Sequence, residues 1–159
     1  MKRPLSLLFV TLASSSVLAA SAVPESSLPD IFRKEPPYMQ NRVCGELMVN
    51  MARMSLDLYT HSGIVGAREA AAVVGTRGMM FEAANAAMTD KEIARAQHIA
   101  NRLERLATPQ TPEILPYKFC EERAERWIKE GVVSAADFKS TEAGVRAALD
   151  KVAPLPKAK

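Results

Sequence analysis

The sequence is poor in the residue types that most catalytic and metal sites require. Its 159 residues include two histidines, two cysteines and one tryptophan. It contains no Gly-x-Ser-x-Gly and no His-Glu-x-x-His motif, and the glycine-bracketed run at 75–78 is too short to cradle a phosphate. Because no set of residues specifies a reaction, we predict no catalytic residue, no cofactor and a non-enzymatic function.

The chain also lacks a strong excess of charge of either sign. Its 21 basic and 18 acidic residues leave a formal net charge of +3, whereas nucleic-acid-binding proteins usually carry a large basic excess. Beyond the N-terminal region, no stretch is long and apolar enough to cross a bilayer. We therefore predict no nucleic-acid partner, and no transmembrane segment after signal cleavage.

The N-terminus has the organisation of a secretory signal peptide. Two basic residues at 2–3 precede a broken apolar stretch over 5–18, and the small residues at 20–22 then fit the small-x-small cleavage rule. We predict a signal peptide over residues 1–22, with Val23 as the first residue of an exported protein. The absence of any Asn-x-Ser/Thr sequon favours the bacterial periplasm over secretion from a eukaryotic cell.

The two cysteines are expected to pair. An even number of cysteines in an exported chain predicts a disulfide, here between Cys44 and Cys120. Two free buried thiols are the alternative. A zinc site is not favoured, because His61 and His98 do not lie at ligand spacing from the cysteines.

The apolar pattern predicts an all-α fold, a small bundle of five to seven helices stapled by that disulfide after a cleaved signal peptide. No segment shows the sustained alternation of a half-buried strand. Residues 23–37 hold four prolines and are expected to form an extended arm. Residues 38–153 are expected to form one helical domain, and residues 154–159 a basic tail.

The first helix is predicted over residues 38–60. Its apolar side falls within about 80° of arc and consists of Val43, Leu47, Met51, Met54 and Leu58. The same helix carries a Met-x-x-Met-x-x-Met run at Met48, Met51 and Met54. Thioethers suit Cu(I), so a copper site is one hypothesis for this run. Core packing and an adaptable apolar binding groove are the others.

The segment 64–88 is rich in alanine and is interrupted by Gly75 and Gly78. Because each glycine costs about 1 kcal/mol in a helix interior, we expect two shorter helices, over 64–74 and 78–88. A single buried central helix is the alternative.

A basic stripe follows on the next helix. Thr89 and Glu92 form a capping box that predicts a helix over 90–107. One sector of about 80° holds five cationic or potentially cationic side chains and no acid: Lys91, Arg95, His98, Arg102 and Arg105. We predict that this stripe binds an acidic partner. Its alternatives are a solvated face, or pairing with the acidic residues of the following helix.

Two helical regions complete the chain. One is predicted over 117–130, with Cys120 and Trp127 on its apolar side, so the disulfide should tie it to the first helix. Ser134 and Asp137 predict a short capped turn, and a last helix is expected to begin near residue 141.

The layout of a signal peptide, a helical body, and one cysteine in an early and one in a late helix is similar to that of periplasmic acid-stress chaperones. It also resembles immunity proteins of type VI secretion effectors. We therefore predict a periplasmic or secreted protein that binds another protein as an inhibitor, immunity factor or chaperone. A copper-handling protein and an enzyme of unknown type are the alternatives.

Overall fold

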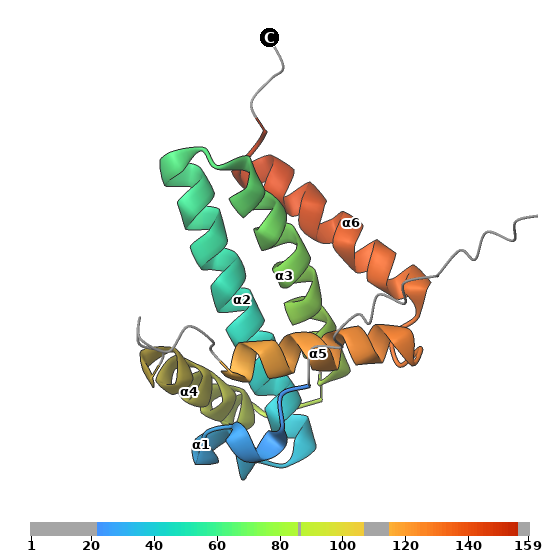
Figure 1. The fold of residues 1–159 in the computed structure, drawn as a ribbon. Helices are drawn as coiled ribbons and strands as arrows, with labels where there is room; N and C mark the ends of the chain where they lie inside the picture. Colours follow the sequence, from blue (N-terminus) through green and yellow to red (C-terminus); the bar gives the residue numbers. More distant parts are fainter. Residues whose placement is uncertain (1–21, 86, 107–114, 156–159) are drawn as a thin grey trace, which may run out of the picture.

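The computed structural model describes residues 22–85, 87–106 and 115–155, and all regular structure in these ranges is helical (Figure 1). This confirms the predicted all-α fold. In chain order the elements are the 3-10 turn η1 (Glu25–Ser27) and the helices α1 (Asp30–Arg33), α2 (Pro37–Ser62), α3 (Val65–Ala84), α4 (Asp90–Leu106), α5 (Leu115–Lys129) and α6 (Ala135–Val152). Apart from Ala22, the predicted signal peptide lies outside these residues, as does most of the predicted basic tail.

The helices α2 and α3 form a tightly packed antiparallel pair. Gly63 ends α2 in the left-handed conformation, with φ of 70°, which glycine adopts without a steric penalty. A Cβ atom on Gly78 would lie 3.0 Å from Val49 Cγ2, and one on Gly45 would lie 3.3 Å from Phe81 Cβ. The two glycines therefore set how closely the helices approach.

The expected break at Gly75 and Gly78 is wrong, because α3 is one continuous helix from Val65 to Ala84. The helical cost of each glycine is about 1 kcal/mol. Close packing of α3 against α2 offsets this cost, since each atom pair brought into contact adds dispersion energy. The alternative of a single central helix describes the structure.

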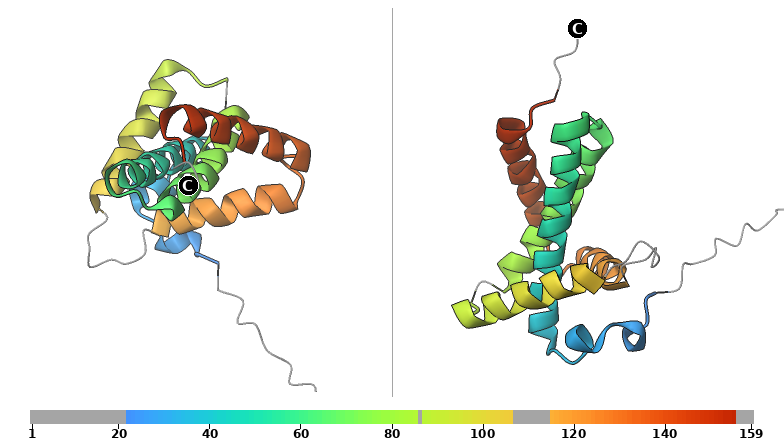
Figure 2. Two further views of the ribbon diagram at one scale, coloured as in Figure 1. Left: turned by 90° about the horizontal axis from the view of Figure 1, so that it is seen from above. Right: turned by 90° about the vertical axis from the view of Figure 1, so that its left-hand side faces the viewer.

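The main core surrounds the first half of α2, where α1, α4 and α5 pack around it (Figures 1 and 2). Val43, Leu47 and Met48 are fully buried there. The predicted apolar side fails further along the helix, because Met54 is 55% exposed and Leu58 is 51% exposed. Because α4 and α5 cross α2 in its first half, they do not cover these two side chains of the second half (Figure 1).

The predicted extended arm is also wrong. Residues 23–37 form η1 and α1, and Val23, Leu28 and Phe32 are buried in the core. The prolines lie at or beside the helix starts, where the missing N–H costs nothing: Pro29 is the N-cap of α1 and Pro36 that of α2.

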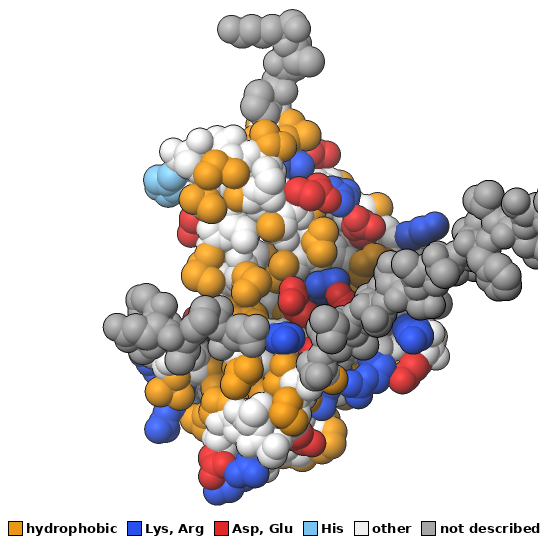
Figure 3. Space-filling model, viewed as in Figure 1, with side chains coloured by type: hydrophobic (Ala, Val, Ile, Leu, Met, Phe, Trp, Pro, Cys, Tyr) orange, Lys and Arg blue, Asp and Glu red, His pale blue; other side chains and the backbone are white. Residues whose placement is uncertain are grey.

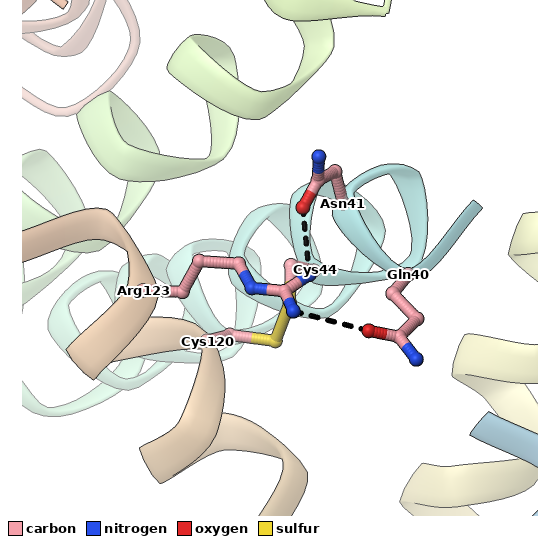
Figure 4. The surroundings of a disulfide bond; sticks show 5 residues. All are labelled: Gln40, Asn41, Cys44, Cys120 and Arg123. Carbon is pink, nitrogen blue, oxygen red and sulfur yellow. Dashed lines mark hydrogen bonds between the residues drawn. A yellow bond between two sulfur atoms is a disulfide. The ribbon is translucent and has the colours of Figure 1, made fainter. Parts of the chain in front are cut away.

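The disulfide joins Cys44 of α2 to Cys120 of α5, as predicted, with 5.3 Å between the Cα atoms and both residues fully buried. Figure 4 shows Arg123 reaching beside it from α5 toward α2. The Arg123 guanidinium donates to Asn41 Oδ1 at 2.7 Å and to Gln40 Oε1 at 3.1 Å. Burial lowers the pKa of Arg123, and these two amide oxygens partly replace its lost water.

The last helix is longer than expected. Ser134 caps it, with Ser134 Oγ accepting from the Asp137 N–H at 3.0 Å, and α6 then runs without interruption from Ala135 to Val152. The separate turn before residue 141 is therefore wrong. Within the described part of the chain, no helix has the length and apolar character needed to cross a membrane.

Candidate functional site

An apolar groove of about 260 Å³ lies between α2, α3 and α6. Figure 1 shows α3 between the other two helices, above α5. The side chains that face the groove are almost all apolar and come from the second half of α2, the middle of α3 and the end of α6. They include Val49, Ala52 and Leu56 of α2, Gly75 of α3, and Val145 and Ala148 of α6.

Small residues keep the floor of the groove open. A Cβ atom on Gly75 would lie 3.5 Å from Ala52 Cβ and 3.6 Å from Val145 Cγ1, so both flanking helices come within van der Waals reach of α3 here. Met79 is 45% exposed and Val152 is 68% exposed at the groove. Hydrophobic side chains also emerge in patches on the face shown in Figure 3. Contiguous exposed apolar surface, unlike scattered residues, marks an interaction site.

Polar contacts fix α6 as the wall of the groove. Arg146 of α6 donates to Glu69 of α3, with 2.8 Å between Nη1 and Oε2. These hydrogen bonds hold the pKa of Glu69 below its usual value. The buried Arg68 donates from Nε to the Ala153 carbonyl oxygen at 2.7 Å and pairs with Asp150. These contacts therefore hold α6 against α3.

One cationic side chain, that of Arg53, lines the groove. Arg53 is exposed and lines it, and no ion pair is recorded for Arg53 among the residues that the structure describes. By contrast, Arg68 of α3 pairs with Asp150, and Arg146 of α6 pairs with Glu69. An anionic group at the groove would therefore meet a cation that is not already neutralised.

The basic stripe lies on the outer side of α4, and all five of its residues are exposed. Arg95 pairs with Glu35 at 2.6 Å, which raises the pKa of Arg95. No ion pair is recorded for the other four side chains within the described ranges. Two acids of α5, Glu121 and Glu125, pair with Arg77 of α3, at 3.3 and 3.0 Å. The stripe is thus not neutralised by α5.

The three methionines of the run lie in different surroundings. Met48 is fully buried and packs under α3, where its Cβ atom lies 3.2 Å from the position of a Cβ on Gly78. Met51 is half-buried against the core and Met54 is 55% exposed. This distribution favours the packing hypothesis over a shared Cu(I) site. No cluster of three His, Cys, Asp or Glu side chains suited to a metal occurs among the residues described.

Comparison with protein-family models, with curated proteins and with solved structures finds no match to this chain. The function proposed below therefore rests on the chain's own geometry.

The groove could be recognised only in part from the sequence. A groove on the methionine helix was one of the alternatives there, and the small residues Ala52, Ala71 and Gly75 are the signal that lay in the sequence. The contribution of α6 depends on its packing angle, for which no sequence signal exists.

Proposed function

We propose that this is an exported, non-enzymatic protein that binds another protein through the groove between α2, α3 and α6. The occupant is an amphipathic helix of the partner that carries an acidic residue beside its apolar side. The observation that carries the proposal is an almost wholly apolar groove, walled by three helices and lined also by Arg53, for which the described residues supply no ion pair.

The shape of the groove suits a helix. From Val49 to Leu56 the wall on α2 spans about 10 Å, at 1.5 Å per residue, and Val145 to Val152 give the same span on α6. Two helical turns of a partner fit this length and place residues i, i+3 or i+4, and i+7 in the groove. A fourth helix would complete a bundle with α2, α3 and α6.

The charges suit an acidic partner. A carboxylate on the docked helix would pair with Arg53, which supplies specificity more than affinity. The basic stripe on α4 adds four cations or potential cations for which the described structure records no ion pair, and these would speed the encounter with an acidic surface. Docking and steering thus lie on separate surfaces of the protein.

An inhibitor or immunity factor would hold one partner stoichiometrically, whereas a chaperone would hold many partners weakly. Both uses need the same groove. The copper-handling alternative has less support, because Met48 is fully buried in the core and is not accessible to a shared Cu(I) site.

The groove is tested with two matched variants on α6. Ala148 and Ala147 are both exposed, but Ala148 lines the groove and Ala147 does not. Ala148→Glu places a carboxylate in the groove and should abolish binding of an acidic amphipathic helix. Ala147→Glu should leave it unchanged. Both are measured with the exported protein as bait for envelope proteins, followed by titration with the partner obtained. Equal binding by the two variants would contradict the groove.

A further inference from the structure

We propose that signal cleavage creates an ion pair. The new α-ammonium group of Val23 pairs with Glu122 of α5 and stabilises the packing of the N-terminal segment on the core. This inference rests on the export part of the proposed function. It does not depend on the groove or on its occupant.

The geometry centres on one backbone nitrogen. The Val23 N–H donates to Glu122 Oε2 at 2.9 Å, across 99 positions of sequence. The Val23 side chain is only 8% exposed and belongs to the main core, whereas Ala22 is exposed. Burial therefore begins at the residue that follows the predicted cleavage site. A carboxylate is aimed at the atom that cleavage would convert into a charge.

The chemistry of the step is peptide hydrolysis. A signal peptidase adds water across the Ala22–Val23 bond, so Ala22 leaves with a carboxylate and Val23 keeps the amine. The amine takes up a proton near neutral pH, since an α-amino group titrates near pH 8. The hydrogen bond between a neutral amide and the Glu122 carboxylate then becomes a bond between two charges, which is stronger.

Other charged side chains lie near the contact between Val23 and Glu122. On α5, Arg123 is engaged with Asn41 and Gln40, and no ion pair is recorded for Arg126 in the described part of the chain. Glu25 of η1 contributes a second negative charge near Arg123. The contact that carries the inference is the one between the Val23 nitrogen and Glu122 Oε2.

The ion pair would stabilise more of the structure than the two residues that form it. The segment behind Val23 leads through Leu28 to Phe32, which is fully buried and meets Phe119 of α5 edge-on at 5.6 Å between ring centroids. The Arg123 guanidinium lies over the Phe119 ring, 4.5 Å from its centroid. The N-terminal segment and α5 thus share one packed interface, and the ion pair would close its outer end.

The first experiment determines the N-terminus. The full chain is exported from a bacterial host, and the mature protein is sequenced from its N-terminus by mass spectrometry. We expect the chain to begin at Val23. A chain that begins elsewhere, or that keeps residues 1–22, overturns the inference, and the latter result also removes the export part of the proposed function.

The second experiment separates charge from packing. Two forms are prepared, one beginning at Val23 and one beginning at Ala22, each with and without Glu122→Gln. In the Val23 form the substitution should lower the unfolding midpoint, corresponding to a loss of about three- to tenfold in the folding constant. The loss should be smaller in the Ala22 form, where an amide replaces the ammonium group. Equal losses in the two forms overturn the ion pair.

A readout other than stability guards against a variant that folds poorly. Acylation of the N-terminal amine at neutral pH requires the uncharged amine, so it should be several-fold slower in the wild-type Val23 form than in Glu122→Gln. Glu130→Gln is the matched control, because Glu130 is an exposed acid just beyond α5 with no ion pair recorded in the described structure. Its acylation rate should equal that of wild type. Equal rates for wild type and Glu122→Gln overturn the proposal.

Discussion

Replacing Gly75 and Gly78 separately by alanine should change stability in opposite directions. Both glycines lie within α3, three residues apart, so each substitution gains about 1 kcal/mol of helix propensity. At Gly75 the new methyl group would meet its nearest neighbours at 3.5 and 3.6 Å, which is ordinary van der Waals contact. Gly75→Ala should therefore stabilise the protein by about 0.5–1 kcal/mol.

At Gly78 the same methyl group would lie 3.0 Å from Val49 Cγ2, 3.2 Å from Val49 N and 3.2 Å from Met48 Cβ. Two of these atoms belong to or adjoin the α2 backbone, so relief requires the helices to separate. Overpacking of this kind costs about 1–3 kcal/mol. After the gain in propensity, Gly78→Ala should be destabilising by up to about 2 kcal/mol.

Urea unfolding of the oxidised protein, followed by circular dichroism, measures both changes against wild type. Gly75→Ala should raise the midpoint and Gly78→Ala should lower it. If both substitutions raise the midpoint equally, the close approach of α2 and α3 is wrong. If both lower it strongly, α3 does not continue as a helix through these residues.

Two further predictions concern the disulfide and the basic stripe on α4. Reduction of the Cys44–Cys120 disulfide should lower the free energy of unfolding by about 4.5 kcal/mol on the chain-entropy model, because the bridge spans 76 positions. Two alkylatable thiols in the untreated protein would contradict the bridge. The double variant Arg95→Glu, Arg102→Glu should slow association with an acidic partner and weaken its salt dependence, and it also removes the Arg95–Glu35 pair, in which the Glu35 side chain is largely buried. A lower melting temperature with an unchanged association rate would instead assign the stripe a purely structural role.

The features that the sequence predicts correctly are set by local chemistry. The capping box at the start of α4 forms as expected, with the Thr89 N–H donating to Glu92 Oε2 at 2.9 Å, and this bond lowers the pKa of Glu92. The disulfide was predictable because the sequence has two cysteines, both on apolar helix sides, behind an N-terminus that resembles a signal peptide.

The errors arise where tertiary packing outweighs a local cost. Gly78 looks like a helix breaker in the sequence, yet it lies within α3. The contact with α2 that stabilises it there cannot be recognised from the local sequence. Pro29 and Pro36 exclude a helix interior but favour a helix start, so the same residues are compatible with an arm and with α1 and α2. Met54 fits the apolar side by period, but its exposure depends on where α4 and α5 cross.

The candidate site was less predictable than the fold. The stripe on α4 follows from spacing alone and is exposed as expected, although Glu35 is a partner that no periodicity reveals. Predicting the groove would require the relative placement of three helices, and no single segment of the sequence indicates that placement.

The most direct test of the central claim is site-specific photo-cross-linking from the groove. A photoreactive side chain is placed at Ala148 in the exported protein, and the same side chain at Ala147 serves as the control. The account predicts one dominant cross-linked protein from position 148, attached through an amphipathic helix that carries an acidic residue, and little from position 147. No cross-link from position 148, or equal cross-linking from both positions, would contradict binding in the groove.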